Sequence, residues 1–141
     1  TTYNRTFAQE RVADLVNACL WAKKSGGKVI LCGTGQAGLW ALLAAPAADV
    51  VVANCEGVDT SSDARLLQKD LFIPGLRKIG AFEGVATLAA PRPIFLNKTG
   101  EKFLTSWLKD VYGSLKSSQA MKAQPDLVSD EQISDWIAQL K

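Results

Sequence analysis

A glycine-rich turn is the first feature of this sequence whose residue types and spacing could serve chemistry. Gly33-Thr34-Gly35-Gln36-Ala37-Gly38 forms a complete G-x-G-x-x-G pattern. Such glycines permit a tight turn and a close backbone approach, and a helix that follows offers free N–H groups to a pyrophosphate. Glu56, after the next expected strand, would accept hydrogen bonds from a ribose. One interpretation is therefore an NAD- or FAD-binding module that uses Gly33, Gly35, Gly38 and Glu56.

The same turn also fits a nucleophile elbow, the G-x-S-x-G turn that exposes a catalytic serine between a strand and a helix. Gly35 occupies the serine position, and glycine has no oxygen to acylate. Thr34 does not lie at the apex, and the chain has no histidine to take the proton. An elbow of this kind keeps its backbone geometry but cannot perform acyl transfer. The Gln36 N–H would then form half of an oxyanion hole that binds a ligand without reacting with it. In a third interpretation, the glycines only let a strand and a helix pack closely.

Composition limits the function classes further. The chain has 141 residues, of which 48% are hydrophobic and 21% charged, as in an ordinary globular domain with one core. Its net charge of +2 is scattered, which argues against nucleic acid as a partner. No apolar run approaches the roughly 20 residues of a bilayer span, so no membrane partner is expected. Cys19, Cys32 and Cys55 lack metal-ligand spacing and are interpreted as core thiols, so we expect no metal and, apart from the NAD or FAD alternative, no cofactor.

Strand and helix patterns alternate along the chain. A parallel sheet with flanking helices is therefore expected, because strands joined through helices form right-handed crossovers. Ser129 and Gln132 form a capping box before the last helix. Short apolar runs of the first two strands indicate burial on both faces. The expected helices are 7–24, 36–45, 103–115 and 129–140, and the expected strands are 28–32, 49–54, 91–97 and, at an edge, 120–126.

Ligands of parallel sheets bind beyond the carboxyl ends of the strands. The loops to consider are therefore Gly33–Gly38, Asn54–Asp59 and Asn97–Glu101. Glu56 and Asp59 also have a plainer interpretation as solvated acids of a turn. Trp107 is expected on an apolar helical stripe, whereas Trp40, just after the turn, would pack beside whatever occupies the loop cleft.

Several segments resemble the α/β-hydrolase superfamily, in particular its acetyl xylan esterase-like and dienelactone hydrolase-like group. The sharpest likeness is Ala90-Pro91-Arg92-Pro93 leading into the apolar strand that ends at Asn97, which in that group ends near the triad acid. The segment from Leu71 to Gly80 and the opening Tyr3-Asn4-Arg5, followed by Arg11-Val12-Ala13-Asp14, are also similar. The resemblance implies that residues 1–141 form a single domain equivalent to the C-terminal half of the hydrolase fold.

The resemblance also defines what is missing. Gly35 replaces the nucleophile, no histidine lies in Gln119–Val128, and only Glu101 is a candidate acid, although it would equally suit the first turn of a helix. A half-sheet would leave an unpaired apolar edge, which folded proteins normally cover. We therefore expect a fragment of a larger protein, whose partner is the missing N-terminal half or another subunit. The implied function is non-catalytic, structural or ligand-binding; the alternatives are the dinucleotide module and an ester hydrolase completed by residues outside this chain.

Overall fold

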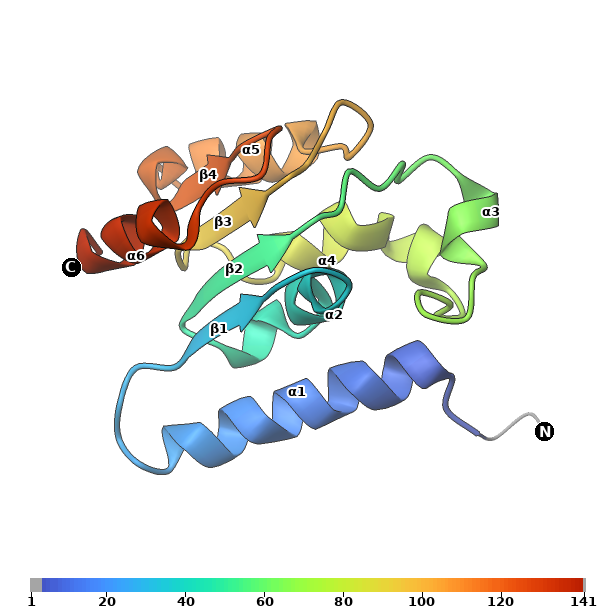
Figure 1. Cartoon of the computed structure of the whole chain (residues 1–141), viewed down its shortest axis with the longest axis horizontal. Coiled ribbons are helices and arrows are strands. Elements are labelled where there is room, and N and C mark those ends of the chain that lie inside the picture. Colours follow the sequence, from blue (N-terminus) through green and yellow to red (C-terminus); the bar gives the residue numbers. More distant parts are fainter. Residues whose placement is uncertain (1–3, 141) are drawn as a thin grey trace.

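A four-stranded, all-parallel sheet forms the centre of the computed structural model, which describes residues 4–140 (Figure 1). The strands run in the order β1-β2-β3-β4. They are β1 (Ile30–Gly33), β2 (Val50–Asn54), β3 (Ile94–Asn97) and β4 (Met121–Ala123). The prediction of a parallel α/β fold is confirmed, including the short edge strand near residue 120.

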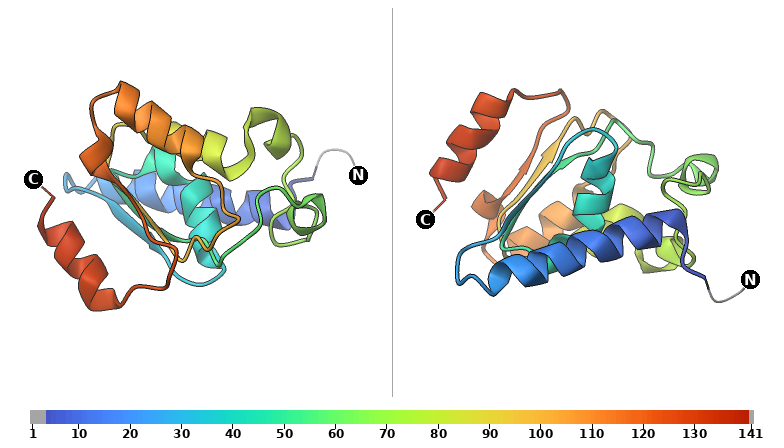
Figure 2. Two further views of the ribbon diagram at one scale, coloured as in Figure 1. Left: turned by 90° about the horizontal axis from the view of Figure 1, so that it is seen from above. Right: turned by 60° about the horizontal axis from the view of Figure 1, so that its bottom comes forward.

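Helices cover the two faces of the sheet unequally. Figure 2 shows one face packed by α1, α2, α4 and α5, whereas α6 alone lies on the other. The helices are α1 (Phe7–Lys23), α2 (Ala37–Leu43), α3 (Asp63–Leu66), α4 (Ala81–Thr87), α5 (Ser106–Ser114) and α6 (Asp130–Ala138). Short 3₁₀ turns occupy Ala45–Ala47, Leu76–Ile79 and Ser118–Ala120. No helix of residues 4–140 is both long and apolar enough to cross a membrane.

Local sequence explains where the outer helices begin. The Thr6 hydroxyl accepts from the Gln9 N–H at 3.2 Å, and the Gln9 side chain accepts from the Thr6 N–H at 2.8 Å. Ser129 and Gln132 form the same reciprocal pair at the start of α6, as predicted. Each capping box satisfies two backbone donors that a helix leaves free.

The core lies mainly under the face covered by several helices. All five residues of β2 are buried, which matches the fully buried strand predicted from its run of valines. On the opposite face, Val50, Val52 and Phe95 pack against Trp136 of α6, with the Phe95 and Trp136 rings 5.2 Å apart. This second cluster holds α6 in place over β2 and β3.

The Ala90-Pro91-Arg92-Pro93 segment has a structural role at the start of β3. The Arg92 guanidinium donates to the carbonyl oxygens of Pro46, at 3.0 Å, and Ala48, at 2.7 Å. The Tyr112 hydroxyl donates to the Arg92 carbonyl at 2.6 Å, and burial raises the pKa of Tyr112 to about 12. Because the strands are parallel, these contacts lie at the end of the sheet opposite the glycine turn.

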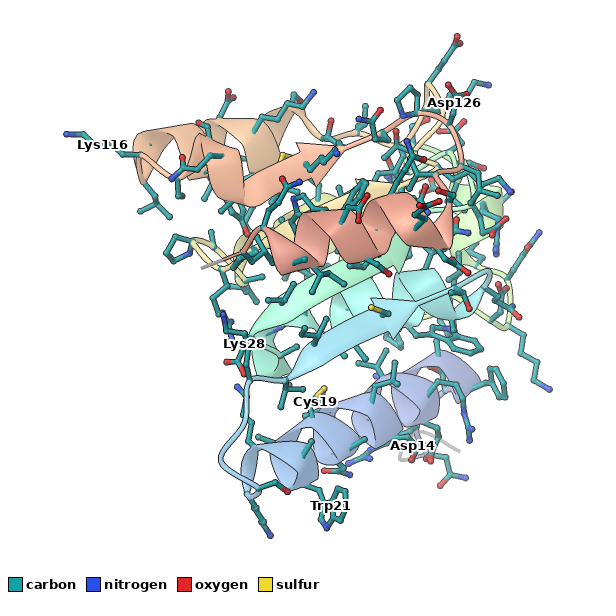
Figure 3. All side chains as sticks on the ribbon, turned by 60° about the vertical axis from the view of Figure 1, so that its left-hand side comes forward. Asp14, Cys19, Trp21, Lys28, Lys116 and Asp126 are labelled. Carbon is teal, nitrogen blue, oxygen red and sulfur yellow. The ribbon has the colours of Figure 1, made fainter. Side chains whose placement is uncertain are left out.

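The interpretation of the first strand as buried on both faces is wrong. In β1, Ile30 is 40% exposed and Cys32 is exposed, so Cys32 is not a core thiol, unlike Cys19 and Cys55. Within the described chain, β1 pairs only with β2, and α6 does not extend over it. Figure 3 shows α6 in front of the sheet and the face of β1 in open view.

At α5, the expected start of the helix at residue 103 and the expected place of Glu101 in a first helical turn are also wrong. α5 begins at Ser106, so Phe103 is buried ahead of the helix and Glu101 lies in an exposed turn rather than in a first helical turn. Trp107 is 48% exposed because its ring rests on Gly80 and Gly84 at the surface instead of entering the core. Tyr3, part of the opening resemblance, lies outside the described residues.

Candidate functional site

The glycine turn connects β1 directly to α2. β1 ends at Gly33, and Gly35 has a φ of +52°. The Ala37 N–H donates to the Thr34 carbonyl at 3.1 Å, and the Gly38 N–H donates to the Gly35 carbonyl at 3.0 Å. These two bonds close the turn and use two of the amide groups that begin the helix.

The three glycines meet different physical requirements. A Cβ on Gly33 would lie 2.6 Å from the Ala41 Cβ, and one on Gly38 would lie 2.0 Å from the Asn54 carbonyl oxygen. These two glycines let α2 pack directly on the sheet. A Cβ on Gly35 would meet nothing within 4 Å, so only its positive φ favours glycine. The apex of the turn is therefore open, as a nucleophile position requires, but has no side chain.

A polar network ties the turn to the segment after α3. The Gln36 side chain donates to the Asp70 carboxylate at 2.8 Å, and the Trp40 indole N–H donates to the Asp70 carbonyl at 2.7 Å. Arg65 binds both Asp70 oxygens, at 3.0 and 2.9 Å, and this pairing holds the pKa of Asp70 below its usual value. Trp40 was expected beside the occupant of the loop cleft, but its ring packs against Phe7 and does not line the groove described below. Arg65 and Asp70 were not predicted from the sequence, because nothing local links them to the turn.

The Gln36 backbone N–H remains available at the apex. It makes no hydrogen bond within residues 4–140, and the Gln36 side chain is directed to Asp70. This is the geometry of a single oxyanion-hole donor. No second donor or nucleophile accompanies it among the predicted site residues.

The two predicted acids are not joined to the glycine turn. Glu56, with a φ of +51°, forms an ion pair with Lys98 of the loop after β3, at 3.0 Å. Glu101 is exposed in the following turn. Among the hydrogen bonds and ion pairs of the described part of the chain, none connects either acid to residues 33–38. Neither observation favours a dinucleotide site, and α2, at seven residues, is short.

A groove of about 560 Å³ opens beside the turn, between the carboxyl ends of the strands and α6. Of the three loops predicted from the sequence, it includes Gly33 and Thr34 of the first and only the opening residues, Asn54 and Asn97, of the other two. Its lining contains Cys32, Gly33 and Thr34 from β1 and the turn, Val52, Asn54 and Asn97 from β2 and β3, and Leu127, Val128, Ser129, Asp130, Ile133, Ser134 and Ile137 from α6 and the segment before it. Thr34 is therefore the predicted site residue that faces the groove together with Gly33.

Cys32 supplies the thiol of the groove lining. Partial burial raises the pKa of this thiol, which disfavours the reactive thiolate form. No histidine exists to act as its base. Within residues 4–140, no cluster of three histidine, cysteine, aspartate or glutamate side chains could hold a metal ion.

The fold and site define a parallel α/β domain with a strand, glycine turn and helix unit beside a groove. No protein-family model matches the chain, and neither a curated protein nor a solved structure does so.

Proposed function

We propose that this chain is a non-catalytic domain of the α/β-hydrolase type that acts as a structural component. Its β1 edge and the open face beside it receive a β-strand from the rest of a larger assembly. The single observation that carries this proposal is the exposure of Ile30 and Cys32 on the strand that leads to the glycine turn. An apolar strand with an unpaired edge is a template for strand addition.

The geometry of the turn supports the non-catalytic part of the proposal. The closely packed Gly33 and Gly38 and the open apex at Gly35 correspond to the elbow of that superfamily. Without an oxygen at residue 35 and without histidine, acyl transfer has neither a nucleophile nor a base. The dinucleotide module and the hydrolase completed by outside residues remain alternative predictions.

The docking edge is tested by the binding of an environment-sensitive apolar dye. The wild-type chain is expected to bind the dye, and Ile30→Lys is expected to reduce binding without lowering the melting temperature. Leu88→Lys is the matched control, because Leu88 is 65% exposed elsewhere on the molecule. An isolated chain that binds no dye, or a loss of signal equal in both variants, contradicts the docking edge.

The absence of catalysis is tested with a simple aryl acetate. Neither the wild-type chain nor Gly35→Ser is expected to hydrolyse it above the buffer rate, because the serine variant still lacks a base. Wild-type hydrolysis above background would show that the chain is an esterase and would overturn the proposal.

A further inference from the structure

Two buried asparagines in the groove each have a side-chain NH₂ group that is not used in a hydrogen bond to the described residues. Asn54 is 8% exposed and Asn97 is 4% exposed. The Asn54 Oδ1 accepts from the Glu56 N–H at 2.8 Å, and the Asn97 Oδ1 accepts from the Val128 N–H at 2.9 Å. A backbone N–H can only donate, so these bonds establish which end of each amide is oxygen. The other end is an NH₂ group in both residues.

Neither NH₂ group has a protein partner in the described chain. The hydrogen bonds of Asn54 and Asn97 involve their oxygens. Among residues 4–140, no fully buried side-chain nitrogen or oxygen lacks a partner, so both nitrogens must retain some open surface. Both residues line the groove, which is where that surface lies. A buried side chain with an unused donor is uncommon, because leaving the group unpaired costs stability.

The sheet places the two amides side by side. Asn54 and Asn97 are partners in the parallel register of β2 and β3, so they face the same side of the sheet, roughly 4.8 Å apart along the sheet. Thr34 follows Gly33, whose partner is Ala53, and so extends the same row towards β1. The row presents two amide donors and one hydroxyl to a single ligand.

The charges around the groove select the kind of ligand. Its lining contains no lysine or arginine and one acid, Asp130. Asp130 and Glu131 occupy the first turn of α6 and already complement the positive end of that helix. An anionic ligand would therefore find no positively charged side chain to pair with and would be repelled by the Asp130 carboxylate. A neutral hydrogen-bond acceptor is favoured instead.

The remaining lining is apolar. Val52 from the sheet and Ile133 and Ile137 from α6 form the walls next to the polar row. A volume of about 560 Å³ is within the range of sites for small molecules. The groove thus combines an apolar body with a donor-rich end.

We propose that this groove is a binding site for a small, uncharged carbonyl compound, such as a ketone or amide with an apolar body. Its carbonyl oxygen accepts from the NH₂ groups of Asn54 and Asn97, and its apolar part lies between Val52 and α6. The groove shares Cys32 with the open face of β1, but its binding groups are the amides of Asn54 and Asn97, so the proposal does not depend on strand docking at β1.

Three probes of similar size test the proposal by titration of the full chain: acetophenone, ethylbenzene and benzoate. Acetophenone is expected to shift the side-chain amide NMR signals of Asn54 and Asn97 saturably. Ethylbenzene has no hydrogen-bond acceptor, so it is expected to bind at least about fivefold more weakly than acetophenone. A loss of that size is typical of one hydrogen bond. Benzoate is expected to bind no better than ethylbenzene. Unmoved amide signals, or benzoate binding as tightly as acetophenone, would overturn the proposal.

Two variants separate the site from general effects on the fold. Asn97→Asp keeps the acceptor for the Val128 N–H but removes the donor, so acetophenone is expected to bind at least fivefold more weakly. Asn17→Asp, on the exposed surface of α1, is the matched control and should leave binding unchanged. Ser134→Trp fills the groove from the surface of α6 and should abolish acetophenone binding. If Asn97→Asp does not fold, Ser134→Trp tests by itself whether acetophenone binds in the groove. Unchanged affinity in Ser134→Trp contradicts the site.

Discussion

At the scale of single residues, Gly38 is where α2 and the sheet approach most closely. A Cβ there would lie 2.0 Å from the Asn54 carbonyl oxygen and 2.5 Å from the Asn54 nitrogen. Both atoms belong to the backbone of a buried strand and cannot move aside cheaply. We therefore expect Gly38→Ala to lower the free energy of unfolding by about 3 kcal/mol, at the upper end of overpacking costs. Urea denaturation measures this loss.

Gly35→Ala is the matched comparison. Its Cβ enters open space, so only the positive φ of residue 35 lowers the free energy of unfolding. The expected loss is about 1 kcal/mol. A larger loss for Gly35→Ala than for Gly38→Ala would show that the turn, rather than the packing of helix on strand, limits stability.

The turn and the groove differ in how far the sequence predicts them. The G-x-G-x-x-G spacing locates the turn, and the strand ends locate the loops that contain Asn54 and Asn97. The unused amide donors are not predictable, because they depend on hydrogen bonds to Glu56 and Val128, and Val128 is distant in sequence from Asn97. A local turn contact orients the Asn54 amide, whereas a tertiary contact orients the Asn97 amide.

At the scale of elements, the sequence predicts best those helices and strands whose signals lie within their own residues. The capping box of α6 and the valine run of β2 are local signals, and both are confirmed. The apolar run of β1 looks the same as that of β2, yet one face of β1 is open. A run of apolar residues indicates that a strand can be buried and does not show whether a second layer is present.

Arg92 joins elements that no local pattern connects. Its guanidinium donates to the carbonyls of Pro46, Ala48 and Ala89, so it ties the start of β3 to the segment before β2. Lysine has the charge but lacks the planar set of donors. We expect Arg92→Lys to lower the free energy of unfolding by about 1–3 kcal/mol, measured by urea denaturation. Arg11→Lys, on the exposed face of α1, is the control; an equal effect would mean that the carbonyl contacts contribute nothing.

At the scale of the whole molecule, the three cysteines report on the two faces of the sheet. Cys19 points from α1 towards the sheet (Figure 3). Cys55 lies in the same core, whereas Cys32 is exposed. Burial raises the pKa of Cys55 to about 12, and partial burial also raises the pKa of Cys32. The layers of the fold therefore predict that only one thiol is accessible in the native chain.

Titration with a disulfide reagent at pH 8 is expected to modify Cys32 in the native protein and to reach Cys19 and Cys55 only after unfolding in urea. Because the thiolate is the reactive form and burial raises the pKa of Cys32, its rate should rise with pH and should be lower at a given pH than that of a fully exposed cysteine in a short peptide. Cys32→Ser should remove the native reaction entirely. A pH profile that rises at lower pH than that of the peptide cysteine would contradict the raised pKa. Native reaction in Cys32→Ser would contradict the burial of the other two thiols. A strand docked on β1 should slow the modification of Cys32, since that side chain lies on the face beside the edge.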